Sequence, residues 1–250
     1  MAFAPTLASL RLAVSFLTVV PVRSDPDGAA ALGTAAGWFP AIGGLLGAVA
    51  GGVDYVLAPS LGPPVAAIVA VGVLVVLTGA LHLDGLADCA DGLGGRSDRE
   101  RRLAIMRDSS VGTFGALGLI LWLLLFAAAL AALGRGDALR GLVVAAGLGR
   151  WAALVHARTS TPARPDGLGA GFRVADGALV LASCTAVVLA GGLLGPVDGL
   201  VGLAVALVVG LSVSAWSGRA LGGLTGDTLG ASVALAEVAV ILTLLAVGLH

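Results

Sequence analysis

Long apolar stretches alternate with polar links along almost the whole chain. Seven apolar windows come close to or exceed the roughly 20 residues that a helix needs to cross a bilayer. They are 34–57, 63–81, 113–133, 139–157, 177–195, 199–218 and 229–249. The segment 5–20 is shorter and carries Arg11, so it fits an interfacial helix, a half-span or part of an eighth helix. Because no period-two alternation occurs, the pattern predicts an all-α, polytopic transmembrane helix bundle, with residues 1–250 as one integral membrane domain.

The polar links between these windows come in two lengths, which alternate along the chain. The short links are 58–62, 134–138 and 196–198. The longer polar links are 82–112, 158–176 and 219–228, and the alternation puts all three on one side of the membrane. That side carries nine of the 14 basic residues, every one of which is arginine. Since cytoplasmic links are enriched in positive residues, we expect these three loops in the cytoplasm.

Composition supports this interpretation and excludes several kinds of function. The chain is 58% hydrophobic and 12% charged, against roughly 25% charged in ordinary soluble domains. Its net charge of −1 gives no indication of a nucleic-acid partner. The sequence holds no Ser-His-Asp set, no zinc-type Cys/His spacing and no Walker loop, which removes triad-based acyl transfer and zinc chemistry. The two cysteines suggest no disulfide framework.

The first long link carries an unusual concentration of acidic residues. Five of the 15 acidic residues fall within positions 84–100. On a helix Asp88 lies about 40° from Asp84, and Asp91 about 20° on the other side, so the three carboxylates share one face. They repel one another unless a cation lies between them, and oxygen-only ligands suit Mg²⁺. A solvated helix face is the simpler alternative, but nearby glycines, Gly94 and Gly95 among them, would let backbone approach a ligand.

The end of the same link is a second candidate for anion binding. Arg107, Asp108 and Ser109 lie at the entrance of the next apolar window, where a helix N-terminus can bind phosphate. An ordinary capping motif with a snorkelling arginine is the alternative. For the preceding arginines, Arg99 among them, we favour a short helix lying on the membrane surface and facing lipid phosphates.

The other two long links and two apolar windows contribute further charges. Arg164 lies in the second link, and Asp227 at the start of the last window either caps a helix or reaches the same cation as the first acids. Arg150 and Glu237 lie inside apolar windows. Both should face the bundle interior, where they can pair with each other in a structural role.

Several motifs together resemble the cobalamin synthase family, the adenosylcobinamide-GDP ribazoletransferases. They are LHLDGLADCADGLGG, DRERRLAIMRDSSVGTFGALGL, GRWAAL, ARPDGLGAGF and GGLTGDTLGA, and with the early FLTVVPV they cover nearly the whole chain. The resemblance implies an integral protein of the cytoplasmic (inner) membrane that requires Mg²⁺. Its substrates would be adenosylcobinamide-GDP and α-ribazole or the 5′-phosphate of α-ribazole, and its products adenosylcobalamin or its 5′-phosphate and GMP.

The resemblance also suggests roles for the candidate residues. Asp84, Asp88 and Asp91 would hold Mg²⁺ against the diphosphate, and either Asp108 or Asp227 would take the proton of the attacking alcohol. The residues expected to contact substrate or phosphate are Arg107, Arg164, Gly94, Gly95, Ser109 and Thr225. The sequence does not fix the oligomeric state, and a homo-oligomer stays open.

Two alternatives remain at this point. A lipid enzyme like the CDP-alcohol phosphotransferases uses analogous chemistry, although the Asp-Gly spacing here departs from the pattern of that family. A cation-coupled transporter is the second alternative, and it predicts acids deep within the spans. The candidate acids instead gather in links on one side, which favours an enzyme.

Overall fold

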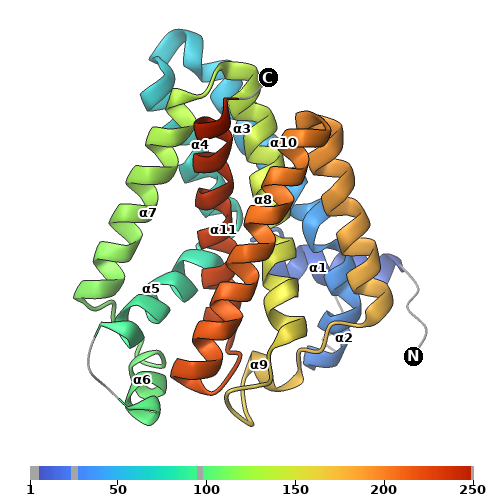
Figure 1. Ribbon diagram of the computed structural model, residues 1–250, viewed down its shortest axis with the longest axis vertical. Helices are drawn as coiled ribbons and strands as arrows, with labels where there is room; N and C mark the ends of the chain where they lie inside the picture. The colour runs from blue at the N-terminus through green and yellow to red at the C-terminus, as the bar shows by residue number, and fades with distance from the viewer. Residues whose placement is uncertain (1–5, 24–27, 95–97, 249–250) are drawn as a thin grey trace.

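The computed structural model describes residues 6–23, 28–94 and 98–248, and these residues fold almost entirely into helices (Figure 1). The helices are α1 (Leu7–Leu17), α2 (Gly28–Ala35), α3 (Phe39–Leu61), α4 (Pro63–Leu77), α5 (Leu81–Leu93), α6 (Arg99–Ile105), α7 (Thr113–Ala132), α8 (Arg135–Thr159), α9 (Leu168–Gly171), α10 (Asp176–Leu221) and α11 (Gly226–Val247). A 3₁₀ turn, Ala36–Trp38, joins α2 to α3. The predicted all-α bundle is confirmed.

Five helical segments are long and apolar enough to cross a membrane, and a sixth is added if the bent pair α4–α5 counts as one span. Helix α10 has 46 residues, about 69 Å if it were straight, which is more than twice the thickness of a bilayer core. It breaks at Gly195, whose φ is +82° and which precedes Pro196. A Cβ on Gly199 would lie 2.8 Å from the backbone of Ala190, so the two arms fold back on each other. These arms are the predicted windows 177–195 and 199–218.

The acidic motif lies on a helix, α5, as the prediction that its carboxylates share one helical face requires. Helix α4 ends at Leu77, before the end of the predicted window 63–81, and α5 leaves it at an angle of 92°. Gly79 and Ala80 both have positive φ, +59° and +57°, which turns the backbone at this corner. The buried residues of α5 include Leu83, Leu86 and Cys89. This apolar face packs against α7 and α11, and the acidic residues occupy the rest of the helix.

The segment 5–20 contains α1, whose 11 residues extend about 16 Å. This length is about half of a bilayer core, so α1 does not span as a single helix. Its start is fixed by reciprocal hydrogen bonds between Thr6 and Ser9, and Trp38 Nε1 donates to Ser9 Oγ at 3.1 Å. Helix α1 therefore lies against the start of α3, near the functional loops.

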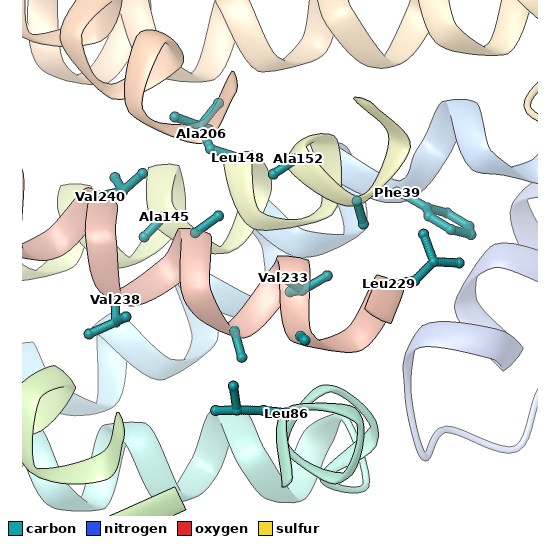
Figure 2. Close-up of a cluster of buried hydrophobic side chains, with 14 of the residues drawn as sticks. Phe39, Leu86, Ala145, Leu148, Ala152, Ala206, Leu229, Val233, Val238 and Val240 are labelled. Carbon is teal, nitrogen blue, oxygen red and sulfur yellow. The ribbon is translucent and has the colours of Figure 1, made fainter. Parts of the chain in front are cut away.

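Helix α8 occupies the centre of the bundle and packs against α3, α10 and α11. Small residues permit this close packing: a Cβ on Gly43 of α3 would lie 2.3 Å from the carbonyl oxygen of Ala146. Figure 2 shows Ala145 of α8 near Val240 of α11 and Leu148 of α8 beside Ala206 of α10, with Leu86 of α5 pointing toward α11 from the other side. The core thus runs from α8 through α11 to α5.

The long links gather at one end of the bundle. In Figure 1 helix α6, helix α9 and the starts of α7 and α11 lie at the lower end, whereas the α3–α4 turn and the C-terminus lie at the upper end. The alternation predicted from the apolar windows therefore brings the three long links together.

Candidate functional site

Helices α5 and α11 touch backbone to backbone at the end of the bundle where the three long links gather, which we call the functional end. A Cβ on Gly85 would lie 2.5 Å from the carbonyl oxygen of Asp227, and one on Gly230 would lie 3.3 Å from the backbone of His82. This approach brings the acids of α5 beside the start of α11. The carboxylates of Asp227, Asp84 and Asp91 are all near enough to repel the charge of Asp88. The sequence prediction that Asp227 joins the first acids is thus supported by their positions.

The start of α11 is held by Thr225 rather than by Asp227. The Thr225 hydroxyl accepts a hydrogen bond from the backbone N–H of Thr228 at 3.2 Å, and Thr228 Oγ1 accepts from the N–H of Thr225 at 3.0 Å. This reciprocal pair is a capping box, so the alternative that Asp227 serves as the cap is wrong. The Thr225 hydroxyl also donates to Asp227 Oδ2 at 3.2 Å. Thr225 is buried and orients Asp227, a role different from the predicted contact with phosphate.

Asp91 is engaged differently from its neighbours on α5. Its two carboxylate oxygens accept hydrogen bonds from the backbone N–H groups of Gly112 and Gly115, both at 2.8 Å. These N–H groups belong to the first turn of α7, where a carboxylate is also favoured by the helix dipole. Asp91 therefore ties α5 to α7, and the acids of α5 left for a ligand are Asp84 and Asp88.

The donor set fits Mg²⁺ bound through few protein ligands. Within residues 6–23, 28–94 and 98–248, no three His, Cys, Asp or Glu side chains are close enough to hold one ion as they stand. Mg²⁺ usually keeps several waters and uses one or two carboxylates together with substrate phosphates. Asp84, Asp88 and Asp227 suit that mode because Asp84 is exposed and the other two are half-buried.

The three long links are tied to one another by backbone and arginine contacts. The Leu224 N–H donates to Thr161 O at 2.7 Å, and the Ala163 N–H donates to Leu224 O at 2.9 Å. Arg99 of α6 then donates to Leu221 O at 2.8 Å and to Ala163 O at 2.5 Å. Our prediction that Arg99 faces lipid phosphates is wrong, because its guanidinium joins all three links. Sequence gave no signal for this role, since a clamping arginine looks like any surface arginine.

Two of the predicted phosphate ligands lie in one hollow beside Arg99. Arg107 forms an ion pair with Asp166 at 2.7 Å, and Arg164 pairs with Asp227 Oδ2 at 3.3 Å. Both arginines line an open hollow of about 450 Å³ between α6 and the second link. Three arginines and two acidic residues, Glu100 and Asp166, line the hollow, which adjoins the carboxylates through the Arg164–Asp227 pair.

The remaining predicted residues fall into three groups. Ser109 and Asp108 are exposed in the turn before α7, and hydrogen bonds from the Ser110 side chain and backbone N–H lower the pKa of Asp108. Gly94 ends α5, and a Cβ there would lie 1.9 Å from the Phe114 ring, so its small size is explained by packing. Gly95 lies outside the described residues.

A largely apolar cavity of about 160 Å³ adjoins the carboxylates. It is lined by Phe16 and Leu17 of α1, Phe39 of α3, Leu81, His82, Asp84 and Gly85 of α5, Arg150, Ala153 and Leu154 of α8, Phe172, and Gly226, Asp227, Leu229, Gly230 and Val233 of α11. Arg150 also forms a buried ion pair with Glu237, which confirms the predicted pairing of these two residues.

Comparisons with known proteins identify the family. A model described as cobalamin-5-phosphate synthase matches residues 9–245, nearly the whole chain. The chain belongs to the cobalamin-5-phosphate synthase family. Relatives named adenosylcobinamide-GDP ribazoletransferase occur in Bradyrhizobium diazoefficiens (40% identity, covering 94% of this chain and 92% of the relative) and Geotalea daltonii (39%, 95% and 96%). Another is found in Escherichia coli (41%, 83% and 85%). No solved structure matches the chain.

Membership of the cobalamin-5-phosphate synthase family makes the chain a membrane-embedded transferase of cobalamin biosynthesis.

Two buried residues that sequence reasoning missed also support the site. His156 Nε2 and Thr228 Oγ1 share a hydrogen bond at 3.2 Å, so α8 braces the capping box that orients Asp227. Gly85 is the second, since only its missing side chain allows α5 and α11 to touch. A His inside an apolar window and a Gly beside an acid are the signals that indicate such positions.

Proposed function

We propose that the chain transfers the adenosylcobinamide phosphoryl group of adenosylcobinamide-GDP to α-ribazole, or to the 5′-phosphate of α-ribazole, and releases GMP. The observation that carries this proposal is the meeting of Asp84, Asp88 and Asp227 with an arginine-lined hollow at one end of the bundle. The family and the names of the relatives support the choice of substrates. Neither a CDP-alcohol phosphotransferase nor a cation transporter has comparable support.

The reaction replaces one phosphoanhydride bond with a phosphate ester. The ribazole alcohol attacks the phosphorus next to cobinamide, the bond to the GMP phosphate breaks, and the alcohol proton passes to a carboxylate. We assign that proton to Asp227, which lines the cavity beside Asp84. Asp108 is exposed outside the cavity and its pKa is held low, which makes it a weak proton acceptor.

The arginines neutralise and orient the diphosphate. Guanidinium groups present planar, forked donors that match phosphate oxygens. Arg107 and Arg164 reach the same hollow from two different links, so a diphosphate bound there is held from both sides. As Arg164 turns toward phosphate, its pairing with Asp227 weakens and that carboxylate becomes free to accept a proton. Ser109, at the entrance of α7, is a further phosphate donor in this proposal.

Mg²⁺ is the cofactor that we propose for this site. Asp84 and Asp88 are the residues that would hold it, while Asp227 opposite them is left as the proton acceptor. The ion would supply positive charge that offsets the negative charge of the diphosphate. The carboxylates contribute by fixing that charge at the junction of α5 and α11.

A release assay tests the proposed function. Purified protein in detergent is mixed with adenosylcobinamide-GDP, and GMP is measured with and without α-ribazole and with and without Mg²⁺. The proposal predicts GMP only when both are present. GMP release that is independent of α-ribazole, or complete transfer in the presence of a chelator, would contradict it.

We also propose that the functional end faces the cytoplasm, on the basis of the arginine excess in its links. The native Cys184 is exposed, so the test uses a Cys184→Ser background. In intact cells Asp137→Cys should react with a membrane-impermeant thiol reagent and Ser109→Cys should not. Labelling of Ser109→Cys but not of Asp137→Cys would show that the functional end faces the outside.

A further inference from the structure

The cavity beside the carboxylates has a feature that the transfer chemistry does not use. Phe39 stacks on Phe16 with ring centroids 5.7 Å apart and planes 16° apart, and on Phe172 at 6.3 Å and 11°. All three rings line the cavity and come from α1, α3 and the second link. A stack of aromatic rings in the lining suits a flat aromatic ligand, which can extend the stack or pack against its edges and gains from burial as well.

Arg150, which lines the cavity, has buried hydrogen-bond donors without a partner among the described residues. Arg150 is 1% exposed, and its Nη1 donates to Ala146 O and to Glu237. Within the described part of the chain, its Nε and Nη2 have no hydrogen-bond partner. Buried donors of this kind are costly unless something accepts from them. A ligand atom with a lone pair at this depth would remove that cost.

The cavity extends from the reacting groups into the bundle. Asp227 and Val233 both line the cavity, and α11 rises about 9 Å between them. Asp84 and Asp227 lie nearer the loops, whereas Arg150 and Val233 lie deeper. A nucleoside inserted base first would therefore leave its ribose hydroxyls beside the carboxylates.

We propose that this cavity holds the aromatic base of the acceptor nucleoside, with Arg150 donating a hydrogen bond to a ring nitrogen. The inference rests on the proposed function, which supplies a ribazole, the nucleoside of a benzimidazole. A benzimidazole is flat, largely apolar and has one ring nitrogen with a free lone pair. These properties match the stacked rings of Phe16, Phe39 and Phe172 and the unpartnered donors of Arg150.

The guanine base of the donor fits this cavity less well. Guanine carries several donors and acceptors along its edges, and each would need a partner once buried. Asp84, Asp227, His82 and Arg150 have polar side chains, and the other lining residues are apolar residues or glycine. The donor nucleotide is better accommodated at the open, arginine-lined hollow, where its phosphates meet Arg107 and Arg164.

Direct binding of a free base tests the cavity without any turnover. Dimethylbenzimidazole is titrated into the purified protein by calorimetry. Ala153 lines the cavity, and Ala153→Leu fills part of it. The variant should weaken binding by about ten-fold or more, and should weaken binding of unsubstituted benzimidazole less, because the lost space is that of the methyl groups. Ala128→Leu, the same change on the exposed face of α7, should bind like the wild type.

Competition distinguishes the two nucleotide substrates. In the transfer assay the free base should compete with α-ribazole and not with adenosylcobinamide-GDP. Competition with the GDP-bearing donor, or wild-type binding by Ala153→Leu, overturns the assignment of the cavity. A protein that binds the base through this cavity but never releases GMP leaves the assignment standing and overturns the proposed function instead.

The role of Arg150 needs a variant that does not leave Glu237 buried and unpaired. The double substitution Arg150→Met with Glu237→Leu removes both charges, which proteins tolerate better than loss of one. The wild type should bind benzimidazole about ten-fold or more above indole, whose ring nitrogen offers no lone pair. The double variant should lose that preference. A preference that persists in the double variant, or one that is absent from the wild type, contradicts the role of Arg150.

Discussion

Helix α11 carries two carboxylates that each pair with an arginine, one near its middle and one in its first turn. The Arg150–Glu237 pair is closed off, with side chains 1% and 4% exposed. The Arg164–Asp227 pair is looser, at 3.3 Å, with side chains 16% and 24% exposed, and it adjoins Asp84 and Asp88. The two pairs have the same chemical groups, yet only the second is partly exposed and lies beside other carboxylates.

The difference comes from what surrounds each pair. Glu237 is enclosed by the central helices, so its charge is compensated only by Arg150. Asp227 instead meets carboxylates across the glycine contact at Gly85. Crowded acids at a partly exposed site are costly without a cation, and such an arrangement is typical of function rather than of stability. We therefore assign the first pair to the stability of the bundle and propose the second for the chemistry.

The largest expected effect is on turnover, through the acids of α5. Asp84→Asn and Asp88→Asn should each lower transfer by about 10²–10³-fold, as loss of one electrostatic group in an active site commonly does. The thermal midpoint in detergent should stay near that of the wild type. Asp91→Asn is the comparison variant: its single carbonyl oxygen can accept from only one of the two N–H groups of α7, so we expect some loss of stability and little loss of turnover. Equal loss in all three variants would return Asp91 to the ligand set that the sequence predicted.

The closed pair should respond in the opposite way. Glu237→Gln leaves the Arg150 charge buried without a counter-charge and should cost about 3–5 kcal/mol of stability. Unfolding in detergent followed by circular dichroism measures this cost. The double replacement of Arg150 by Met and Glu237 by Leu should recover most of it. A Glu237→Gln variant as stable as the wild type would mean that the ion pair is not a structural feature of the core.

The glycine contact can be changed without touching a charge. Gly85→Ala places a Cβ 2.5 Å from the carbonyl oxygen of Asp227, so α5 and α11 must separate, at a cost of about 1–3 kcal/mol. Transfer should fall as Asp84 moves away from Asp227. Gly72→Ala on α4 meets nothing within 4 Å and should be neutral or slightly stabilising. Full activity of Gly85→Ala would show that this contact does not set the geometry of the site.

The smallest effect is expected at Asp108. Because hydrogen bonds from Ser110 lower its pKa, Asp108 stays ionised well below neutral pH and is a poor base. Asp108→Asn should therefore change neither the rate of transfer nor its pH profile near neutrality. Loss of the acidic limb of the profile, together with a large fall in rate, would make Asp108 the proton acceptor in place of Asp227.

Much of this arrangement could be predicted from sequence, because a helix that crosses lipid must be long and apolar and its charged residues must lie in the links or be paired. Apolar windows located the spans, and the alternation of link lengths brought the first acids and Asp227 to one end. The Arg150–Glu237 pairing followed from the cost of lone charges inside spans. These predictions depend on composition and length, which require no knowledge of local geometry.

The remaining features depend on local geometry that composition does not encode. The apolar pattern runs through Thr78–Ala80, so the 92° corner before α5 left no sign, and Ala80 has a positive φ that alanine rarely adopts. The commitment of Asp91 to α7 depends on where Gly112 and Gly115 come to lie. Arg99 likewise became a clamp only because two carbonyl groups meet its side chain.

The most direct test of the central claim is the transfer rate of Asp227→Asn, measured together with its thermal midpoint. Thr225 and Thr228 supply the cap of α11, so this substitution should leave stability almost unchanged. Asn carries no charge and accepts no proton at neutral pH, so ribazole transfer should nearly disappear. Transfer at the wild-type rate by the folded variant would contradict the account and remove the start of α11 from the chemistry.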